Sequence, residues 1–164
     1  MDSRSDARPA LLTALVLLVG QFLLGMVVNL FATVPKDHPG ANPPEYFSGV
    51  VVNVAWALLH GPFWLVLHAS LGLLLLAGGV VILVQAIRSR TRRQIVTASF
   101  GLFGVLGAGF NGGSYLNYHE DFSSMLMAGG FAIAVVSCAI ALNMAGNAEA
   151  DPAAERTPSP TSSN

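Results

Sequence analysis

The sequence predicts an all-α integral membrane protein, a bundle of four transmembrane helices with a further helix on its outer side. Of its 164 residues 53% are hydrophobic and only 10% are charged, and the mean hydropathy is +0.60. Soluble domains carry roughly a quarter charged residues. A helix crosses a hydrocarbon layer of about 30 Å in around 20 residues. Four spans are therefore expected from the four apolar stretches, at 9–34, 63–87, 95–110 and 122–144.

Basic residues predict how the bundle is oriented. Lys36 alone falls in the loop between the first two stretches, whereas the other seven basic residues fall on the opposite side, at Arg4, Arg8, Arg88, Arg90, Arg92, Arg93 and Arg156. By the positive-inside rule, both termini of this multi-pass protein of the cell membrane are cytoplasmic. No nucleic-acid-binding patch is indicated. The basic link at 88–93 is interpreted as a topology signal. Contact of this link with anionic lipid is a further interpretation that stays open.

The remaining segments complete the domain organisation. Residues 1–8 form a cytoplasmic N-terminus with no convincing cleavage site after it, and 9–144 form the membrane domain. The tail at 145–164 is polar and rich in Pro and Ser, so we expect it to be disordered. Within the outer segment at 35–60, the stretch Glu45–His60 has few helix breakers. It predicts an interfacial helix that packs its apolar residues toward the bundle, namely Val51, Val52, Ala55 and Leu58.

A weak internal repeat directs attention to two histidines. His68 stands nine residues before Ala-Gly-Gly at 77–79, and His119 stands nine residues before Ala-Gly-Gly at 128–130. Upstream of each histidine comes Leu-Gly followed by Asn four residues after the glycine, which gives Asn29 and Asn111. The chain is therefore interpreted as two helix-pair repeats.

Helical rise predicts that these four side chains share one depth. His68 precedes Arg88 by 20 residues, which is about 30 Å along a helix, and similar counts bring the other three to the outer edge of the hydrocarbon layer. Facing inward, the two imidazoles are placed as the axial ligands of a bis-histidine haem b, with Asn29 and Asn111 in the same layer. The alternative is a His/Asn layer that only fixes helix packing. Abundant glycine suits either a flat macrocycle or close helix approach.

One family resemblance supports the first interpretation. The stretch "GQFLLGM" and the helix opening "HASLGLLLL" resemble the Gln-x-x-Leu-Gly and His-x-x-Leu-Gly elements of haem A synthase, over roughly residues 15–140. The resemblance implies a four-helix half-unit with His68 and His119 as haem ligands. The chain departs from the family by having no cysteine pair in the first outer loop, no Arg after either histidine and no second half. What the resemblance implies is therefore a haem b site, without the synthase chemistry.

Other residues offer weaker candidates. His60 is an alternative ligand to His68, because Gly61-Pro62 allows the helix to break between them. His38 is expected to be solvated in a loop. Glu120 and Asp121 are interpreted as an exposed helix start, and the alternative is that they orient His119. Cys138 stands alone, so neither a disulfide nor a thiolate metal site is indicated.

The function predicted is a membrane haem protein that handles electrons or haem at the outer face. The alternative is a non-catalytic structural or accessory membrane subunit. Transport ranks third, because the first two apolar stretches carry no Asp, Glu, Lys or Arg at 10–34 or 63–87. The expected partners are the lipid bilayer and either another membrane protein or a second copy of the chain.

Overall fold

The computed structural model describes residues 7–150, with side chains from 8 to 146. Within this range the chain is entirely helical apart from its connections, and no strand occurs. The five helices are α1 (Ala7–Phe31), α2 (Tyr46–His60), α3 (Phe63–Ser89), α4 (Arg92–Tyr118) and α5 (Asp121–Ala150). Four of them, all except α2, are long and apolar enough to cross a membrane. The predicted all-α fold with four candidate spans is therefore confirmed.

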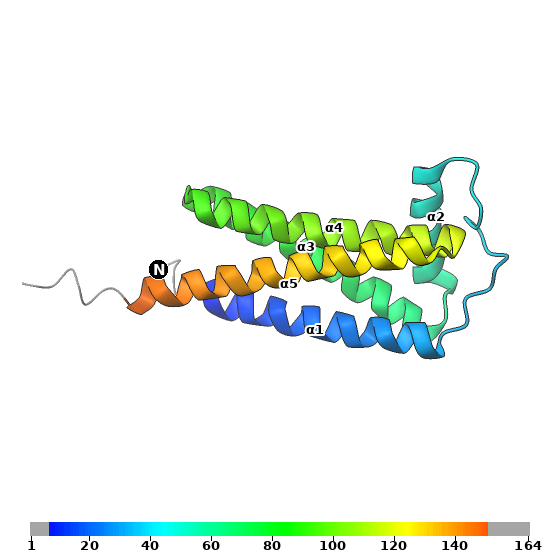
Figure 1. The fold of residues 1–164 in the computed structure, drawn as a ribbon, viewed down its shortest axis with the longest axis horizontal. Coiled ribbons are helices and arrows are strands. Elements are labelled where there is room, and N and C mark those ends of the chain that lie inside the picture. Colours follow the sequence, from blue (N-terminus) through cyan, green and yellow to red (C-terminus); the bar gives the residue numbers. More distant parts are fainter. Residues whose placement is uncertain (1–6, 151–164) are drawn as a thin grey trace, which may run out of the picture.

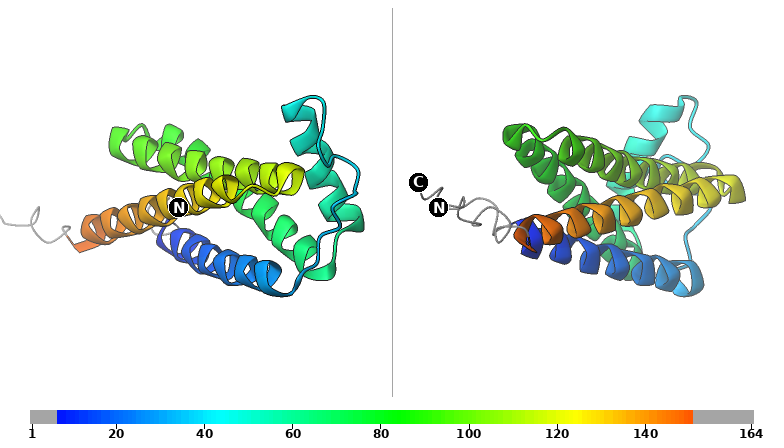
Figure 2. Two further views of the ribbon diagram at one scale, coloured as in Figure 1. Left: turned by 45° about the vertical axis from the view of Figure 1, so that its right-hand side comes forward. Right: turned by 60° about the vertical axis from the view of Figure 1, so that its left-hand side comes forward.

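The four long helices form a closed ring in which each packs on two neighbours. The pairs are α1 with α3, α3 with α4, α4 with α5, and α5 with α1. Figure 2 shows α1 and α5 close together near the start of α1 and separating toward the end where α2 lies. Helix α2 lies across one end of the bundle, where it packs on α3 and α4 (Figure 1). Toward the opposite end, α3 and α4 diverge from α1 and α5.

Large apolar side chains point outward over the whole bundle. Phe22, Leu74, Phe103 and Val136 are each at least half exposed, like many others on the four long helices. In water such a surface would be unfavourable by roughly 25 cal/mol for each Å². A helix of 27 residues such as α3 or α4 is about 40 Å long, which exceeds a hydrocarbon layer of about 30 Å. These features suit helices that tilt within lipid.

Small residues bring α4 and α5 into the closest contact in the bundle. A Cβ built on Gly104 would lie 2.6 Å from the carbonyl oxygen of Gly130 and 2.7 Å from the backbone nitrogen of Ala134. A Cβ built on Gly130 would lie 2.7 Å from the backbone nitrogen of Ala108. Each helix thus presents Gly-x-x-x-Ala to the other, which is the small-residue packing of membrane helices. These two glycines serve helix approach and do not leave room for a macrocycle.

The centre of the ring is a small apolar core. It contains Leu18 of α1, Leu75 of α3, and Ala134 and Cys138 of α5, all buried. The Cys138 thiol donates to the backbone oxygen of Leu11 at 3.4 Å, so even this polar atom joins two helices.

Two details of the predicted organisation are corrected. The third apolar stretch, predicted at 95–110, is part of a helix that runs to Tyr118, because its polar second half is covered by α2 and α5. The tail predicted to be disordered from residue 145 begins as helix, since α5 continues through Ala150. The rest of that tail, at 151–164, and residues 1–6 lie outside the described residues.

The prediction for α2 was right about the helix and wrong about its buried face. Gly49, Val50, Asn53 and Ala57 are buried, whereas Val51, Val52 and Ala55 are exposed and Leu58 is half-buried. The physical reason is the close approach of α4: a Cβ built on Gly113 would lie 2.8 Å from the Val50 side chain. Such an approach selects small residues and leaves the larger apolar ones on the outside of α2.

Candidate functional site

The structure does not bring the four predicted site residues together inside the bundle. His68 lies in the second turn of α3 and is partly buried, but His119 and Asn29 are exposed. Asn111 is partly buried and donates to the oxygen of Gly107, one turn earlier in its own helix, at 2.7 Å. The prediction that His68 and His119 face each other inside the bundle is therefore wrong.

His119 is outside the bundle because it ends a helix. It is the C-cap of α4, with a left-handed backbone (φ 55°), and its backbone N–H donates to the oxygen of Tyr115 at 2.8 Å. Helix α5 then starts at Asp121. His119 is thus part of a tight turn, whereas its supposed counterpart His68 is inside a helix. Asp121, in the first turn of α5, takes the place that acidic residues favour at helix starts.

The partner of His68 is Gln21 of α1. The Gln21 amide nitrogen lies 3.3 Å from Nε2 of His68 and donates to the backbone oxygen of the same residue at 3.1 Å. When Gln21 donates to Nε2, that nitrogen is the acceptor, and the neutral imidazole carries its proton on Nδ1. One side chain of α1 thereby fixes both the ring and the backbone of a residue in α3.

Two glycines make this contact reciprocal. A Cβ built on Gly25 would lie 3.0 Å from Cε1 of His68, and a Cβ built on Gly72 would lie 3.3 Å from the amide nitrogen of Gln21. The glycine follows the polar residue by four positions on each helix, so it lies on the same face one turn further on. Gln21-x3-Gly25 and His68-x3-Gly72 therefore interlock between antiparallel helices.

Each member of the pair also keeps one polar atom without a hydrogen-bond partner. These atoms are Nδ1 of His68 and Oε1 of Gln21, and both are buried. Leaving such a group unpaired costs about 1–3 kcal/mol. The pair is therefore the polar centre of the α1–α3 contact, and it has spare hydrogen-bonding capacity.

The residues present do not fit a bis-histidine haem. Such a site needs two imidazoles on opposite faces of the iron, and the second predicted ligand, His119, is exposed in a turn. The edge of the His68 ring is packed against Gly25, and its Nε2 is occupied by Gln21. His60, the alternative ligand, is exposed at the end of α2. Among the side chains at 8–146, no group of three or more His, Cys, Asp or Glu is placed to hold a metal ion.

A second polar cluster, which sequence reasoning missed, joins α2 to α4 and to the loop between α1 and α2. Asn53 of α2 and Asn117 of α4 are the largest fully buried side chains, and their amides contact each other. Asn53 donates to the oxygen of Gly40 at 3.2 Å. With its nitrogen facing the neighbouring carbonyls, Asn117 donates to the oxygens of Gly113 at 3.2 Å and Gly49 at 3.3 Å.

Backbone conformation completes this cluster. Gly40 has φ 94°, and a Cβ there would meet Oδ1 of Asn53 at 2.7 Å, so glycine is needed on both counts. The backbone N–H of Asn42 donates to the oxygen of Asn117 at 3.1 Å. The sequence signal was the polar run "NGGSYLN" at 111–117, which is out of place in an apolar span.

His38 lies beside this polar cluster and packs on α2. It was predicted to be solvated, but it is buried. It is 8% exposed, and its ring stacks on Trp56 of α2 with centroids 4.3 Å apart. Its Nε2 is buried without a partner. A flat apolar face of Trp56 accounts for the burial, because stacking removes both rings from water.

Comparison with known proteins adds no assignment. No family model, no curated protein and no solved structure matches this chain. The resemblance to haem A synthase stays a prediction.

Proposed function

We propose that this protein is a non-catalytic structural or accessory membrane protein, in which buried polar side chains fix the packing of four spanning helices and hold α2 across their outer end. This was the alternative interpretation of the sequence. The proposal is supported by the buried polar side chains, because several of them make contacts between one helix and another.

Three side-chain contacts between different pairs of helices support this proposal. Gln21 binds His68 between α1 and α3. The hydroxyls of Ser114 and Ser123, both buried, lie 3.2 Å apart between α4 and α5. The amides of Asn53 and Asn117 contact each other between α2 and α4. In a bilayer, such contacts fix register because a slipped helix would leave each group unpaired in hydrocarbon.

The interlocked pair at Gln21 and His68 is the single observation that supports the proposal most. A ligand-binding imidazole would need its Nε2 or Nδ1 directed at the ligand. Here Nε2 is engaged by Gln21, and Gly25 closes on the ring edge. Both glycines are placed as a packing motif requires. Haem binding through His68 is the competing prediction.

An absorption spectrum distinguishes a packing role of His68 from haem binding. The full-length protein, expressed with added haem precursor and purified in mild detergent, is expected to show no Soret band above that of a H68A variant. H119A, which changes an exposed residue, is the matched control. A Soret band with reducible α and β bands that disappears in both H68A and H119A would overturn the proposal in favour of a bis-histidine haem.

A stability measurement gives the proposal a positive test. H68A is expected to lower the unfolding midpoint of the detergent-solubilised protein, and H119A, which removes an exposed ring, is expected to lower it less. Equal stability of wild type and H68A would contradict a packing role for His68.

A further inference from the structure

The side of α2 that faces away from the bundle is an apolar stripe. Its exposed residues recur about every four positions, so they lie on one side of the helix. They are Phe47, Val51, Val52, Ala55 and Leu59. Phe47 is 66% exposed, Val51 69% and Leu59 75%. A helix that lies between a protein core and water turns charged and polar residues outward, and this stripe does the opposite.

Ser48 is the one polar residue beside this stripe, and its hydroxyl needs no partner outside the helix. It donates to the backbone oxygen of Glu45 at 3.2 Å. Asn53, the other polar side chain in the body of α2, is fully buried on the opposite side. No Lys, Arg, Asp or Glu occurs in Tyr46–His60. The exposed side of α2 can therefore enter hydrocarbon without leaving a charge or a hydroxyl donor unpaired.

The stripe is continuous with the apolar outer surface of α4. The centroid of the Phe47 ring lies 5.5 Å from that of Phe110. Phe110 follows Leu106 by one turn of α4, and both Leu106 and Phe103 are exposed. These residues belong to a candidate membrane span. Lipid that covers the outside of α4 thus reaches Phe47 without crossing a polar surface.

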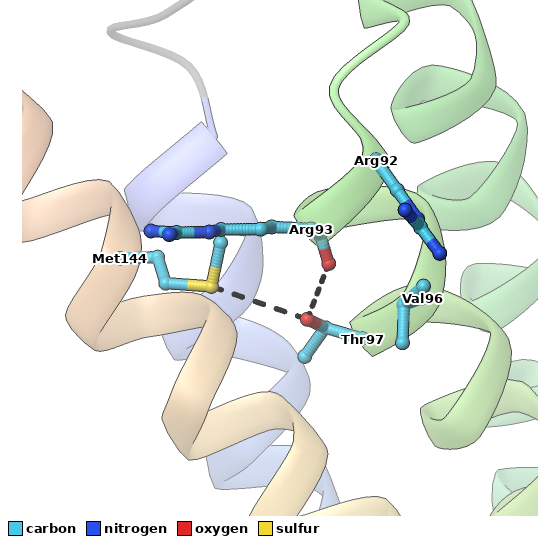
Figure 3. A pocket seen from close by; sticks show the side chains of 5 residues that line it. All are labelled: Arg92, Arg93, Val96, Thr97 and Met144. Carbon is cyan, nitrogen blue, oxygen red and sulfur yellow. Dashed lines mark hydrogen bonds between the residues drawn. The ribbon is translucent and has the colours of Figure 1, made fainter.

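The opposite end of α4 sets the depth at which α2 crosses it. Figure 3 shows Arg92 and Arg93 directed to opposite sides of α4, with Val96 one turn further along the helix. When α4 spans a bilayer, these arginines stand at headgroup level. A hydrocarbon layer of about 30 Å that begins at Val96 takes about 20 residues of helix, so it ends near Leu116.

Helix α2 crosses α4 at this boundary. Figure 1 shows α2 running across the direction of the long helices, beside the last turns of α4. Its side chains contact α4 at Phe110, Gly113 and Asn117. The first two positions precede Leu116, so α2 lies at the edge of the hydrocarbon and not above it. The stacked rings of Tyr46 and Tyr118 agree with this level, because aromatic side chains gather at membrane interfaces.

We propose that α2 is embedded in the leaflet at its end of the bundle, and that its apolar stripe binds the acyl chains of phospholipids. The stripe favours lipid over a second membrane protein because its side chains are bulky apart from Ala55, whereas membrane helices dock through small residues. This surface goes beyond the packing role proposed for the buried polar groups, which lie on the other side of α2.

Charge favours a neutral headgroup at this site. No basic residue occurs in α2. In the part of the chain with described side chains, all acidic residues lie at the α2 end of the bundle, at Asp37, Glu45, Glu120 and Asp121. An anionic headgroup gains nothing from these carboxylates, so the hydrophobic contact alone accounts for binding. Phosphatidylcholine is therefore the lipid of choice for a test.

Photolabelling of the wild-type protein tests the proposal without any variant. The full-length protein is placed at low density in phosphatidylcholine vesicles that contain phosphatidylcholine with a diazirine in the upper part of one acyl chain. After irradiation, mass spectrometry locates the labelled residues. Labelling of the stripe is expected to exceed that of the loop at 36–43 by at least about tenfold. Equal labelling of the two would overturn the proposal.

Two changes of condition identify the source of the contact. Adding phosphatidylglycerol should alter labelling of the stripe by less than about twofold, and a larger rise would overturn the neutral-lipid assignment. Raising the protein-to-lipid ratio should leave this labelling unchanged. A fall that is accompanied by crosslinks between stripes would assign the surface to a second copy of the chain instead.

A pair of variants at one position gives a second test. V51A keeps the stripe apolar, whereas V51E places a charge in it without touching a buried residue. Amide protection of α2 in vesicles, measured by hydrogen exchange, is expected to be at least about tenfold lower in V51E than in V51A. Equal protection would show that Val51 faces water and would overturn the proposal.

Discussion

The Gln21 amide nitrogen lies within hydrogen-bond reach of both Nε2 and the backbone oxygen of His68, at 3.3 and 3.1 Å. A single side chain of α1 thus holds the side chain and the main chain of one residue in α3. Because a backbone oxygen is involved, the contact resists sliding of α3 along α1 as well as rotation of the imidazole. The first two predictions follow from this arrangement.

Replacing both partners together should cost less than the sum of the two single replacements. Q21L leaves the His68 ring unpaired, and H68L leaves the Gln21 amide with only a backbone partner, so each should destabilise by about 1–2 kcal/mol. The double variant Q21L/H68L should be less destabilised than the sum of the two. Reversible unfolding in mixed detergent micelles measures all three. Strict additivity would show that the two side chains do not interact.

The two glycines of the interlocked pair should differ in their tolerance of alanine. At Gly25 a Cβ meets the ring of His68 at 3.0 Å, whereas at Gly72 it meets the end of the flexible Gln21 side chain at 3.3 Å. G25A should therefore be more destabilising than G72A. Gly78 in α3 is the control, because nothing lies within 4 Å of a Cβ there. G78A should stabilise by about 0.5–1 kcal/mol through helix propensity. Thermal unfolding ranks the stabilities of G25A, G72A and G78A. A G25A protein as stable as G78A would contradict the close contact between Gly25 and the His68 ring.

Alanine at the α4–α5 crossing should have the largest effect in the bundle. At Gly104 and Gly130 the new Cβ meets backbone atoms at 2.6–2.8 Å, which a side-chain rotation does not relieve. G104A and G130A should each destabilise by about 1–3 kcal/mol or more, the usual cost of overpacking. G107A on the same helix, with open space around its Cβ, should not destabilise. If G104A and G107A unfold at the same detergent fraction, the close crossing is wrong.

Acid should loosen the start of α2. Glu45 accepts from the backbone N–H groups of Ser48 at 2.6 Å and Phe47 at 3.0 Å, and the bond from Ser48 lowers the pKa of this carboxyl most. A lowered folded pKa means that the ionised cap stabilises the helix above the unfolded pKa near 4.5, and that this stabilisation is lost as pH falls through the lower folded value.

Hydrogen exchange checks this pH dependence. The Phe47 and Ser48 amides, corrected for intrinsic exchange, should lose protection below pH 4.5 in wild type. E45Q keeps an acceptor oxygen but does not titrate, so its protection should be flat over the same range. A wild-type profile parallel to that of E45Q would show that the carboxylate does not cap α2.

Composition was enough to predict the four candidate spans, because the cost of burying charge in hydrocarbon acts on every residue of a span. The faces of the helices were not predictable in the same way. In α2 the larger apolar residues Val51 and Val52 are exposed and Asn53 is fully buried. A rule that places apolar residues inside depends on water outside, and it loses its force where the surroundings are apolar.

The predicted site was wrong because of the position assigned to His119. Counting helical rise back from the far end assumed that His119 belongs to a continuous helix, whereas the chain reverses there in a left-handed turn. The contact between Gln21 and His68 did have a signal in the sequence, because each of the two residues is followed by a glycine four positions later. A single sequence does not reveal which of its many glycines face each other, so the pairing required the structure.

The placement of α2 has a consequence for biosynthesis. Its buried Asn53 is matched by Asn117, which is made 64 residues later. At about 5–20 residues per second, this delay is roughly 3–13 seconds. Until α4 is made, α2 lacks one of the two helices on which it packs, and Asn53 lacks its contact with Asn117. Helix α2 therefore reaches its final packing only after α4, the third of the four long helices, has been made, and a chain stalled before that point lacks this packing at the α2 end of the bundle.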